Sequence, residues 1–363
     1  MTSIILIFSA IITSIYVFLI NKCSLLFYKY ENNITTKSTT PIDIIVSAKN
    51  ECENISKLIY SIYNQTYKNI HLIIIDDNST DNTFQIAQNL QDKYQFTLLK
   101  NPNQGKKSAL RYALTYSKSK YILFTDCDCY SDKNWAETLI NIAETENADM
   151  ILAPVILVAE NKSSLFQRLW EIESFSLITI TAGTCINNSP IMCNGGNLLV
   201  KRDLRNQSDN YLKDKYASGD DIFLLEYALL NNKKIKYSKS ISTIIKTNVA
   251  NNLSSLINQR SRWVSKSKGY KNKYTIFFAL IVFFANILIL LYPIILFFNY
   301  KYWWIILILW TIKTISDIIS AKVSSNYYNY KHNFYDIILL EIIYPIYTLV
   351  CSILGFCKNI KWK

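Results

Sequence analysis

The sequence contains little glycine and little proline, with 7 and 6 residues among 363. Together with a hydrophobic content of 50%, this composition argues against a disordered or fibrous chain and allows a sizeable buried core. The chain also lacks Gly-x-Gly-x-x-Gly and Gly-Lys-Ser/Thr phosphate loops. These absences disfavour a dinucleotide-binding Rossmann site and a Walker-type ATPase.

Histidine is scarce, and the cysteines are not paired along the chain. Neither His71 nor His332 belongs to a recognisable motif, so we expect structural or surface roles for both. The eight cysteines lack the spacing of a zinc site or of a compact disulfide framework. Cys127 and Cys129 lie close together, but no second pair completes a tetrahedral site. We expect reduced thiols in a cytosolic domain.

Acidic residues are in deficit, with 27 against 39 lysines and arginines and a net charge of +12. This charge alone would suit nucleic acid, an anionic membrane surface or a phosphorylated substrate. However, the sequence has no zinc finger and no recognisable RNA-binding motif, and its basic residues cluster beside apolar segments. We therefore expect membrane lipids, and no nucleic acid, among the partners.

Long apolar runs are present near both ends of the chain. Residues 4–20 carry no charge, and residues 276–298 approach the length of about 20 residues that spans a bilayer. Residues 303–321 and 337–356 are also apolar, although both contain charged residues. No basic residue precedes the first run and no small-x-small cleavage site follows it, so we expect a retained anchor rather than a secretory signal.

Basic residues beside these runs predict the membrane topology. Lys22 and Lys29 follow the first run, and a basic stretch at 266–273 precedes the second. Because lysine and arginine stay on the cytoplasmic side, we expect a multi-pass protein of the cell membrane with a cytoplasmic main domain. Three C-terminal crossings would put the basic tail 358–363 outside, against this rule, so two or three crossings remain open. The expected parts are an anchor (1–30), a linker (31–41), the main domain (42–251), an amphipathic interface helix (252–273) and a C-terminal membrane region (274–363).

Apolar strands alternate with helical patterns from residue 42 onward. The strands are continuous apolar runs, which indicates a sheet covered on both faces, and the alternation with helices makes that sheet mostly parallel. We therefore predict an α/β, Rossmann-like fold flanked by transmembrane helices. The predicted strands are 42–48, 71–77, 96–100 and 121–128, and the predicted helices are 51–64, 80–93 and 106–117.

Paired acids follow two of these strands. Asp76 and Asp77 end one strand, and Asp126 and Asp128 end another. Ligands of such sheets bind beyond the carboxyl ends of the strands, and Mg²⁺ or Mn²⁺ prefers oxygen ligands. A single pair would more often cap a helix or form a turn. Two pairs on neighbouring strands favour a site for a divalent cation.

Three further stretches have both a structural and a functional interpretation. Asp220 and Asp221 open an apolar helix, where they are either first-turn acids or a carboxylate that accepts a proton. Lys106 follows Gly105 at a helix start, where a solvated corner and a phosphate site are equally consistent with the sequence. The "NGGN" stretch ending at Asn197 is either a tight turn or a contact with a sugar.

In chain order, "SAKNE", "DDNSTDNT", "GKKSAL", "DCD", "GDD" and "QRSRW" resemble the family 2 inverting glycosyltransferases with a GT-A fold, which include cellulose, chitin and hyaluronan synthases. The resemblance spans residues 41–263. It implies a nucleotide-sugar donor, uridine-linked, with its base near Ala48, Glu51 and Asp77.

The resemblance also implies a role for each acid. Lys106 would lie beside the diphosphate, Asp126 would contact the ribose or metal-bound water, and Asp128 would hold Mg²⁺ or Mn²⁺. Asp221 matches the catalytic base. Asp220 stands where the family more often has Glu, and it keeps the carboxylate on a shorter side chain.

The remaining motif lies in the basic stretch before the second apolar run. Gln259, Arg262 and Trp263 match the family's Gln-x-x-Arg-Trp, whose helix lies on the membrane and closes over donor and acceptor. Arg262 would then neutralise the diphosphate, and Trp263 would stack on the acceptor sugar. We also expect Arg260, Lys266 and Lys268 to face lipid phosphates. Without the acids, these residues would indicate only an interfacial helix.

Together these observations predict a membrane-bound inverting glycosyltransferase of the hexosyl- or N-acetylhexosaminyltransferase class. It would move a sugar from a UDP-sugar to a lipid-linked or polysaccharide acceptor, with acceptor contacts from Trp263 and Asn197. Two alternatives remain open. One is a processive polysaccharide synthase, and the other is a catalytically silent membrane scaffold that binds nucleotide sugar.

Overall fold

The computed structural model describes residues 2–213, 216 and 219–357, and the basic tail 358–363 lies outside these described residues. Contacts group the chain into two compact units. Among the described residues, the sheet unit consists of Glu31–Leu157 and Met192–Asn248, and the helical unit consists of residues 2–30, Val158–Ile191 and residues 249–357. The predicted main domain 42–251 therefore needs correction, because the segment Val158–Ile191 packs with the membrane helices.

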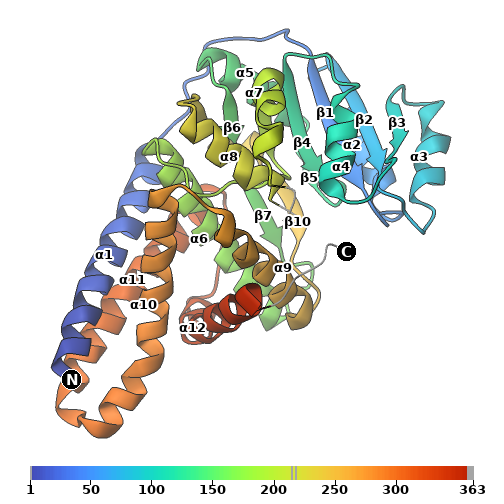
Figure 1. Ribbon diagram of the computed structural model, residues 1–363. Coiled ribbons are helices and arrows are strands. Elements are labelled where there is room, and N and C mark those ends of the chain that lie inside the picture. The colour runs from blue at the N-terminus through green and yellow to red at the C-terminus, as the bar shows by residue number, and fades with distance from the viewer. Residues whose placement is uncertain (1, 214–215, 217–218, 358–363) are drawn as a thin grey trace. The chain divides into compact units, whose positions relative to one another are not determined.

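A mostly parallel sheet organises the sheet unit (Figure 1). Its seven strands have the order β3-β2-β1-β4-β8-β6-β9. Only β8 runs antiparallel to its neighbours, β4 and β6. The continuous apolar strands β1 and β2 are buried on both faces, as predicted. The strands are β1 (Ile42–Ala48), β2 (Ile70–Asp76), β3 (Thr97–Lys100), β4 (Tyr121–Asp126), β6 (Met150–Leu152), β8 (Leu198–Lys201) and β9 (Ile235–Tyr237).

Six helices and a small second sheet complete the described part of this unit. The predicted helices are confirmed, although each is shorter than its sequence pattern. Residues 51–54, for example, form a turn before the helix that was predicted to begin at Glu51. The helices are α2 (Ile55–Tyr63), α3 (Thr83–Gln91), α4 (Lys106–Leu114), α5 (Trp135–Thr145), α7 (Arg202–Gln207) and α8 (Asp220–Leu230), and the small sheet has the order β5 (Tyr130–Ser131), β10 (Ile245–Asn248), β7 (Val155–Val158).

The helical unit contains four helices that are long and apolar enough to cross a membrane, within the described residues. They are α1 (Thr2–Lys29), α10 (Lys273–Phe298), α11 (Trp303–Tyr327) and α12 (Phe334–Cys357), and they are joined by α6 (Leu165–Ile186) and α9 (Leu253–Lys266). Helix α6 approaches α1 closely, because a Cβ on Gly183 would lie 2.4 Å from the Cα of Cys23. A small residue at such a crossing lets two helices pack at short distance.

The charges in the last two apolar segments face one another inside this unit. The Lys313 ammonium lies 2.7 Å from Asp317 and 2.9 Å from Glu341, and the Tyr16 hydroxyl donates to Asp317 at 2.5 Å. These contacts link α1, α11 and α12. Ionisable residues within apolar helices are stabilised by pairing in the interior of a bundle, so they do not prevent these helices from spanning a membrane.

A buried carboxylate connects β1 to the start of β4 in the sheet unit. Asp43 is 1% exposed and accepts hydrogen bonds from the hydroxyl and amide of Ser119, the hydroxyl of Ser117 and the amide of Lys118, at 2.6–2.9 Å. Burial alone would raise the pKa of this carboxyl group, but these hydrogen bonds hold it below its ordinary value. The turn before β4 is thus fixed by one side chain.

Replacing Asp43→Asn should destabilise the sheet unit. The amide puts a donor where the carboxylate accepts, and losing hydrogen bonds to a charged group costs about 2 kcal/mol. We expect the thermal unfolding midpoint of the detergent-purified protein to fall by about 4–8 °C. Asp203→Asn, at an exposed position on α7, is the control.

The stabilisation from Asp43 should depend on pH with a defined sign. Because the pKa is lower in the folded state, the contribution is complete above the ordinary aspartate pKa of about 3.9 and is lost as the pH falls through the folded value. The difference in midpoint between wild type and Asp43→Asn should therefore shrink in acid. A constant difference from pH 7 to pH 3 would contradict this account.

Candidate active site

The sheet brings the acids of two strands to one edge. Strand β1 lies between β2 and β4 and is parallel to both, with Ala48 in register with Asp76 and Ser47 with Asp126. Because the chain winds outward from β1 through β2 to β3, and then crosses to β4 on the other side, this edge contains a topological switch point. Open α/β sheets bind their ligands at such a point.

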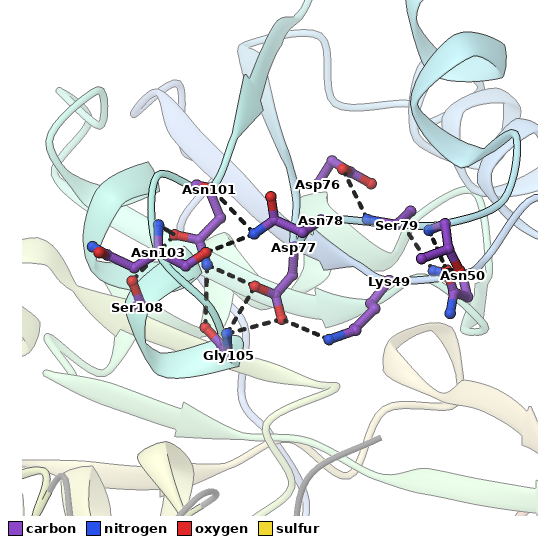
Figure 2. Close-up of polar contacts among 11 residues, drawn as sticks. Lys49, Asn50, Asp76, Asp77, Asn78, Ser79, Asn101, Asn103, Gly105 and Ser108 are labelled. Atoms are coloured by element: carbon purple, nitrogen blue, oxygen red, sulfur yellow. Dashed lines mark hydrogen bonds and ion pairs between the residues drawn. The ribbon is translucent and has the colours of Figure 1, made fainter.

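At this edge Asp77 is held in one orientation by its neighbours (Figure 2). Its amide donates to the carbonyl of Ala48 at 2.8 Å, and its carboxylate accepts from the side chain of Asn101 at 2.6 Å and from the amide of Gly105 at 2.8 Å. The Lys49 ammonium lies 3.8 Å from the same carboxylate. Sequence reasoning missed Asn101 and Lys49, since nothing in the sequence marks an isolated Asn or Lys as a partner of Asp77.

The loop after Asp77 is tied to the turn that contains Glu51. The Glu51 amide donates to Thr83 at 2.8 Å, and Asn54 donates to the Glu51 carboxylate at 2.8 Å. The nearby Asp81 accepts from the amides of Cys52 and Thr83. Burial would raise the pKa of Asp81, but the hydrogen bonds from Thr83 and Cys52 lower it to about 2. Asp81 therefore shapes the loop that presents Glu51 and Asp77.

Lys106 lies among the acids of the other strand end. Its ammonium contacts the Asp126 carboxylate at 2.6 Å. Burial alone would lower the pKa of Lys106, but the negative charges of Asp126, Asp220 and Asp221 raise it, so the side chain stays charged. Its neighbour Lys107 points elsewhere and donates to the carbonyls of residues 212 and 213, so it has a structural role.

Asp128 lies two residues beyond Asp126 and accepts a hydrogen bond from Thr247 at 3.1 Å. Although Asp128 is exposed, the surrounding protein and the charge of Asp126 raise the pKa of its carboxyl group. Two close carboxylates fit a hard divalent cation, which would relieve this repulsion. The described residues contain no cluster of three or more His, Cys, Asp or Glu suited to a metal, so other ligands would have to come from phosphates or water.

A glycine pair lies between Asp126 and Asp221. The amide of Gly195 donates to the Asp221 carboxylate at 3.3 Å, and a Cβ on Gly195 would lie 3.4 Å from the Cβ of Asp221. A Cβ on Gly196 would lie 3.0 Å from the Asp126 carboxylate. Gly196 thus allows the backbone to approach Asp126 closely, whereas a Cβ on Gly195 would make ordinary van der Waals contact with Asp221. The sequence left open whether this stretch is a tight turn or a contact with a sugar, and it did not indicate the approach of the pair to the acids.

The acceptor role expected for Asn197 does not fit its position. Asn197 is fully buried. Its side-chain oxygen accepts from the Trp135 indole at 2.9 Å, and its amide nitrogen donates to the carbonyls of Pro154 and Thr243, each at 2.8 Å. These bonds occupy both ends of the amide, so Asn197 supports the glycine turn from the core side.

Asp220 and Asp221 occupy the first turn of α8, whose N-cap is Gly219. The Asp221 carboxylate accepts from the amides of Gly195 and Ile222, at 3.3 and 2.7 Å. Lys106, Gly195, Asp220 and Asp221 line one pocket. The structure therefore brings together the acids of β4 and α8 with Lys106, as the sequence motifs predicted.

The Gln-x-x-Arg-Trp residues lie on α9, in the helical unit. Gln259, Arg262 and Trp263 are all partly buried. The expectation that Arg260 and Lys266 face lipid phosphates is wrong, because both are buried. The Arg260 guanidinium bonds to Glu173 and to the Tyr347 hydroxyl, and it stacks 4.0 Å from the ring centre of Trp263. Arg260 thus fixes α9 against α6 and α12.

Comparison with known proteins supports the family that the motifs indicate. Residues 43–207 match the model of Glycosyl transferase family 2. The chain is 36% identical over 105 residues to a UDP-Glc:alpha-D-GlcNAc-diphosphoundecaprenol beta-1,3-glucosyltransferase of Escherichia coli, which covers 29% of this chain and 42% of that protein. It is 28% identical over 111 residues to a cholesterol galactosyltransferase of Borreliella burgdorferi, covering 30% and 31%. The chain thus matches less than half the length of these relatives.

A solved structure is similar over nearly the whole chain. It is a mannosyltransferase from Pyrobaculum calidifontis in complex with GDP-Man and Mn²⁺, with a TM-score of 0.63, 13% identity, and coverage of 99% of this chain and 100% of that one. At this identity the likeness concerns the fold, and it agrees with the predicted GT-A architecture. Residues 43–207 of the chain therefore form a glycosyltransferase family 2 domain.

Proposed function

We propose that the protein is a membrane-bound inverting glycosyltransferase that moves a hexosyl or N-acetylhexosaminyl group from a UDP-sugar to a lipid-linked acceptor. The observation that carries this proposal is the convergence of Lys106, Asp126 and Asp221 on the Gly195–Gly196 turn, at the switch point of a family 2 domain. The four apolar helices and the diphosphoundecaprenol in the name of the Escherichia coli relative support a lipid-linked acceptor.

In this proposal Asp221 accepts the proton of the acceptor hydroxyl while the oxygen attacks the anomeric carbon and the nucleoside diphosphate leaves from the opposite face. The amides of Gly195 and Ile222 orient the Asp221 carboxylate for this transfer. Lys106 binds the diphosphate as its charge develops. Asp126 and Asp128 would hold Mg²⁺ or Mn²⁺, which supplies further charge stabilisation to the leaving diphosphate.

The other end of the donor would bind beside Ala48, Glu51 and Asp77. Asp77 would support this site from the core side, because its carboxylate is only 1% exposed and is fixed by Asn101 and Gly105. We assign Gln259 and Arg262 to the diphosphate and Trp263 to the acceptor sugar. The stacking of Arg260 on Trp263 supports this assignment, since it restrains the ring to one orientation.

We propose that all four apolar helices cross the membrane and that the sheet unit is cytoplasmic. With Lys22 and Lys29 inside, three further crossings put the exposed Cys357 outside. An impermeant maleimide should therefore label Cys357 in intact cells, with Cys357→Ser as the unlabelled control. Labelling that appears only after permeabilisation would mean two C-terminal crossings instead of three.

Asp221→Asn separates an enzyme from a scaffold that only binds the donor. The amide preserves size and the helix start, so we expect UDP binding, measured by calorimetry, to be retained. Transfer of radiolabelled sugar should fall by roughly 10²–10⁴-fold, the contribution of a positioned general base. Asp220→Asn should reduce transfer less. Near-normal transfer by Asp221→Asn would remove it as the base.

Asp128→Ala tests the cation site. Because the protein offers two carboxylates, metal and diphosphate should complete each other's coordination, and Mn²⁺ should tighten UDP binding in the wild type. We expect this tightening to disappear in Asp128→Ala and to persist in Asp203→Ala. Calorimetric titrations of UDP with and without Mn²⁺ measure it. Full transfer in excess chelator would contradict the metal assignment.

A further inference from the structure

Arg205 on α7 is a buried cation, and one of its hydrogen-bond donors is unsatisfied. Its side chain is 2% exposed. One guanidinium nitrogen, Nη1, bonds to Asp209 at 3.3 Å, whereas Nη2 has no hydrogen-bond partner among the described residues. Leaving a charged donor unsatisfied in a protein interior costs several times more than leaving it in water. The free edge of this guanidinium therefore requires a polar group beside it.

The pocket around Arg205 provides such groups. Its polar lining consists of the side chains of Lys106, Thr125, Arg205, Asp220 and Asp221 together with Gly195, and the remaining lining residues are apolar. The pocket volume is about 10 Å³, which accommodates a single water molecule and excludes a sugar. A buried water needs two to four polar partners, and this lining provides donors and acceptors for one. The pocket is thus a water-sized space between a guanidinium and two carboxylates.

We propose that Arg205 is a positioning residue for the acid pair, acting on Asp220 through one buried water molecule in this pocket. The negative charges of Asp209 and Asp220 both act on the Arg205 guanidinium, and Asp220 lines the same pocket. A water held between Arg205 and Asp220 would let the positive guanidinium fix the Asp220 carboxylate in one orientation. Asp220 and Asp221 are consecutive in the first turn of α8, so fixing one orients the other. This inference rests on the proposed function, in which Asp221 is the base.

Arg205→Gln tests the inference by removing the charge while keeping a polar side chain. We expect kcat to fall by roughly 10- to 100-fold, the range for one lost hydrogen bond to a charged group, with the KM for the donor unchanged. Arg205→Lys restores the charge and should recover part of kcat. A purely structural role would instead change KM and thermal stability together with kcat.

Arg111→Gln is the matched control. Arg111 bonds to the same oxygen of Asp209, at 2.8 Å, but its side chain is 32% exposed and does not line the pocket. Arg111→Gln removes one positive charge beside Asp209, as Arg205→Gln does. We expect the kcat of Arg111→Gln to stay within about twofold of wild type. Equal losses in Arg111→Gln and Arg205→Gln would assign the effect to Asp209 and overturn the proposal.

A double-mutant cycle identifies the path through Asp220. If Arg205 acts through Asp220, adding Arg205→Gln to Asp220→Asn should cause no further loss of kcat. Additive losses would overturn the proposal, as would normal kcat in Arg205→Gln alone. If Arg205→Gln does not fold, the same double-mutant cycle with Arg205→Lys tests whether Arg205 acts through Asp220. Failure of the proposed function would give a different result, because sugar transfer would then be retained in Asp221→Asn.

Discussion

The active site depends on holding several like charges at close range. Asp126, Asp220 and Asp221 come from β4 and α8, and their mutual repulsion would separate these elements without a cation among them. Lys106, at the start of α4, is that cation, and its contact with Asp126 at 2.6 Å is the shortest link between the two sides of the site. The Lys106 side chain is 16% exposed and that of Asp126 is 38% exposed, so water screens this attraction only in part. This pairing holds the start of α4 beside the end of β4.

The glycine pair imposes a second constraint on the same site. Gly195 and Gly196 fill the gap between Asp126 and Asp221, where a methyl group on Gly196 would lie 3.0 Å from the carboxylate of Asp126. Asn197 then anchors the turn in the core through Trp135, Pro154 and Thr243. The backbone at Gly196 therefore lies close against the acid at the end of β4. The separation between these acids therefore depends on the conformation of the glycine turn.

In the helical unit, buried charges are also paired with charges of opposite sign. Arg260 bonds to Glu173 and Tyr347, and Lys313 bonds to Asp317 and Glu341. Burying such charges costs solvation energy, and a pair of this kind often contributes more to a unique arrangement than to stability. In α9 this arrangement fixes the helix face that presents Gln259, Arg262 and Trp263. Part of the basic stretch before α10 thus packs inside the helical unit and joins its helices, rather than facing lipid headgroups.

Much of this architecture follows from local sequence. The continuous apolar strands, the helical periodicity and the acids at strand ends predict a mostly parallel sheet with a site at its carboxyl edge, because these features act over a few residues and repeat. The membrane helices follow for the same reason, since length and hydropathy are properties of a single segment. The order of the motifs along the chain indicated the family, and the match of residues 43–207 to the family model supports it.

Tertiary structure decided what no local pattern contains. Arg260 and Arg262 stand two residues apart with the same chemistry, and only packing against α6 and α12 makes Arg260 an internal clamp. Asn197 was expected at the acceptor, but its partners come from three segments distant in the chain. Arg205 carries no motif, and it becomes significant only because folding brings α7 to the pocket beside Asp220. Hydrogen bonds and charges act through space, so the roles of such residues depend on neighbours that the sequence does not place beside them.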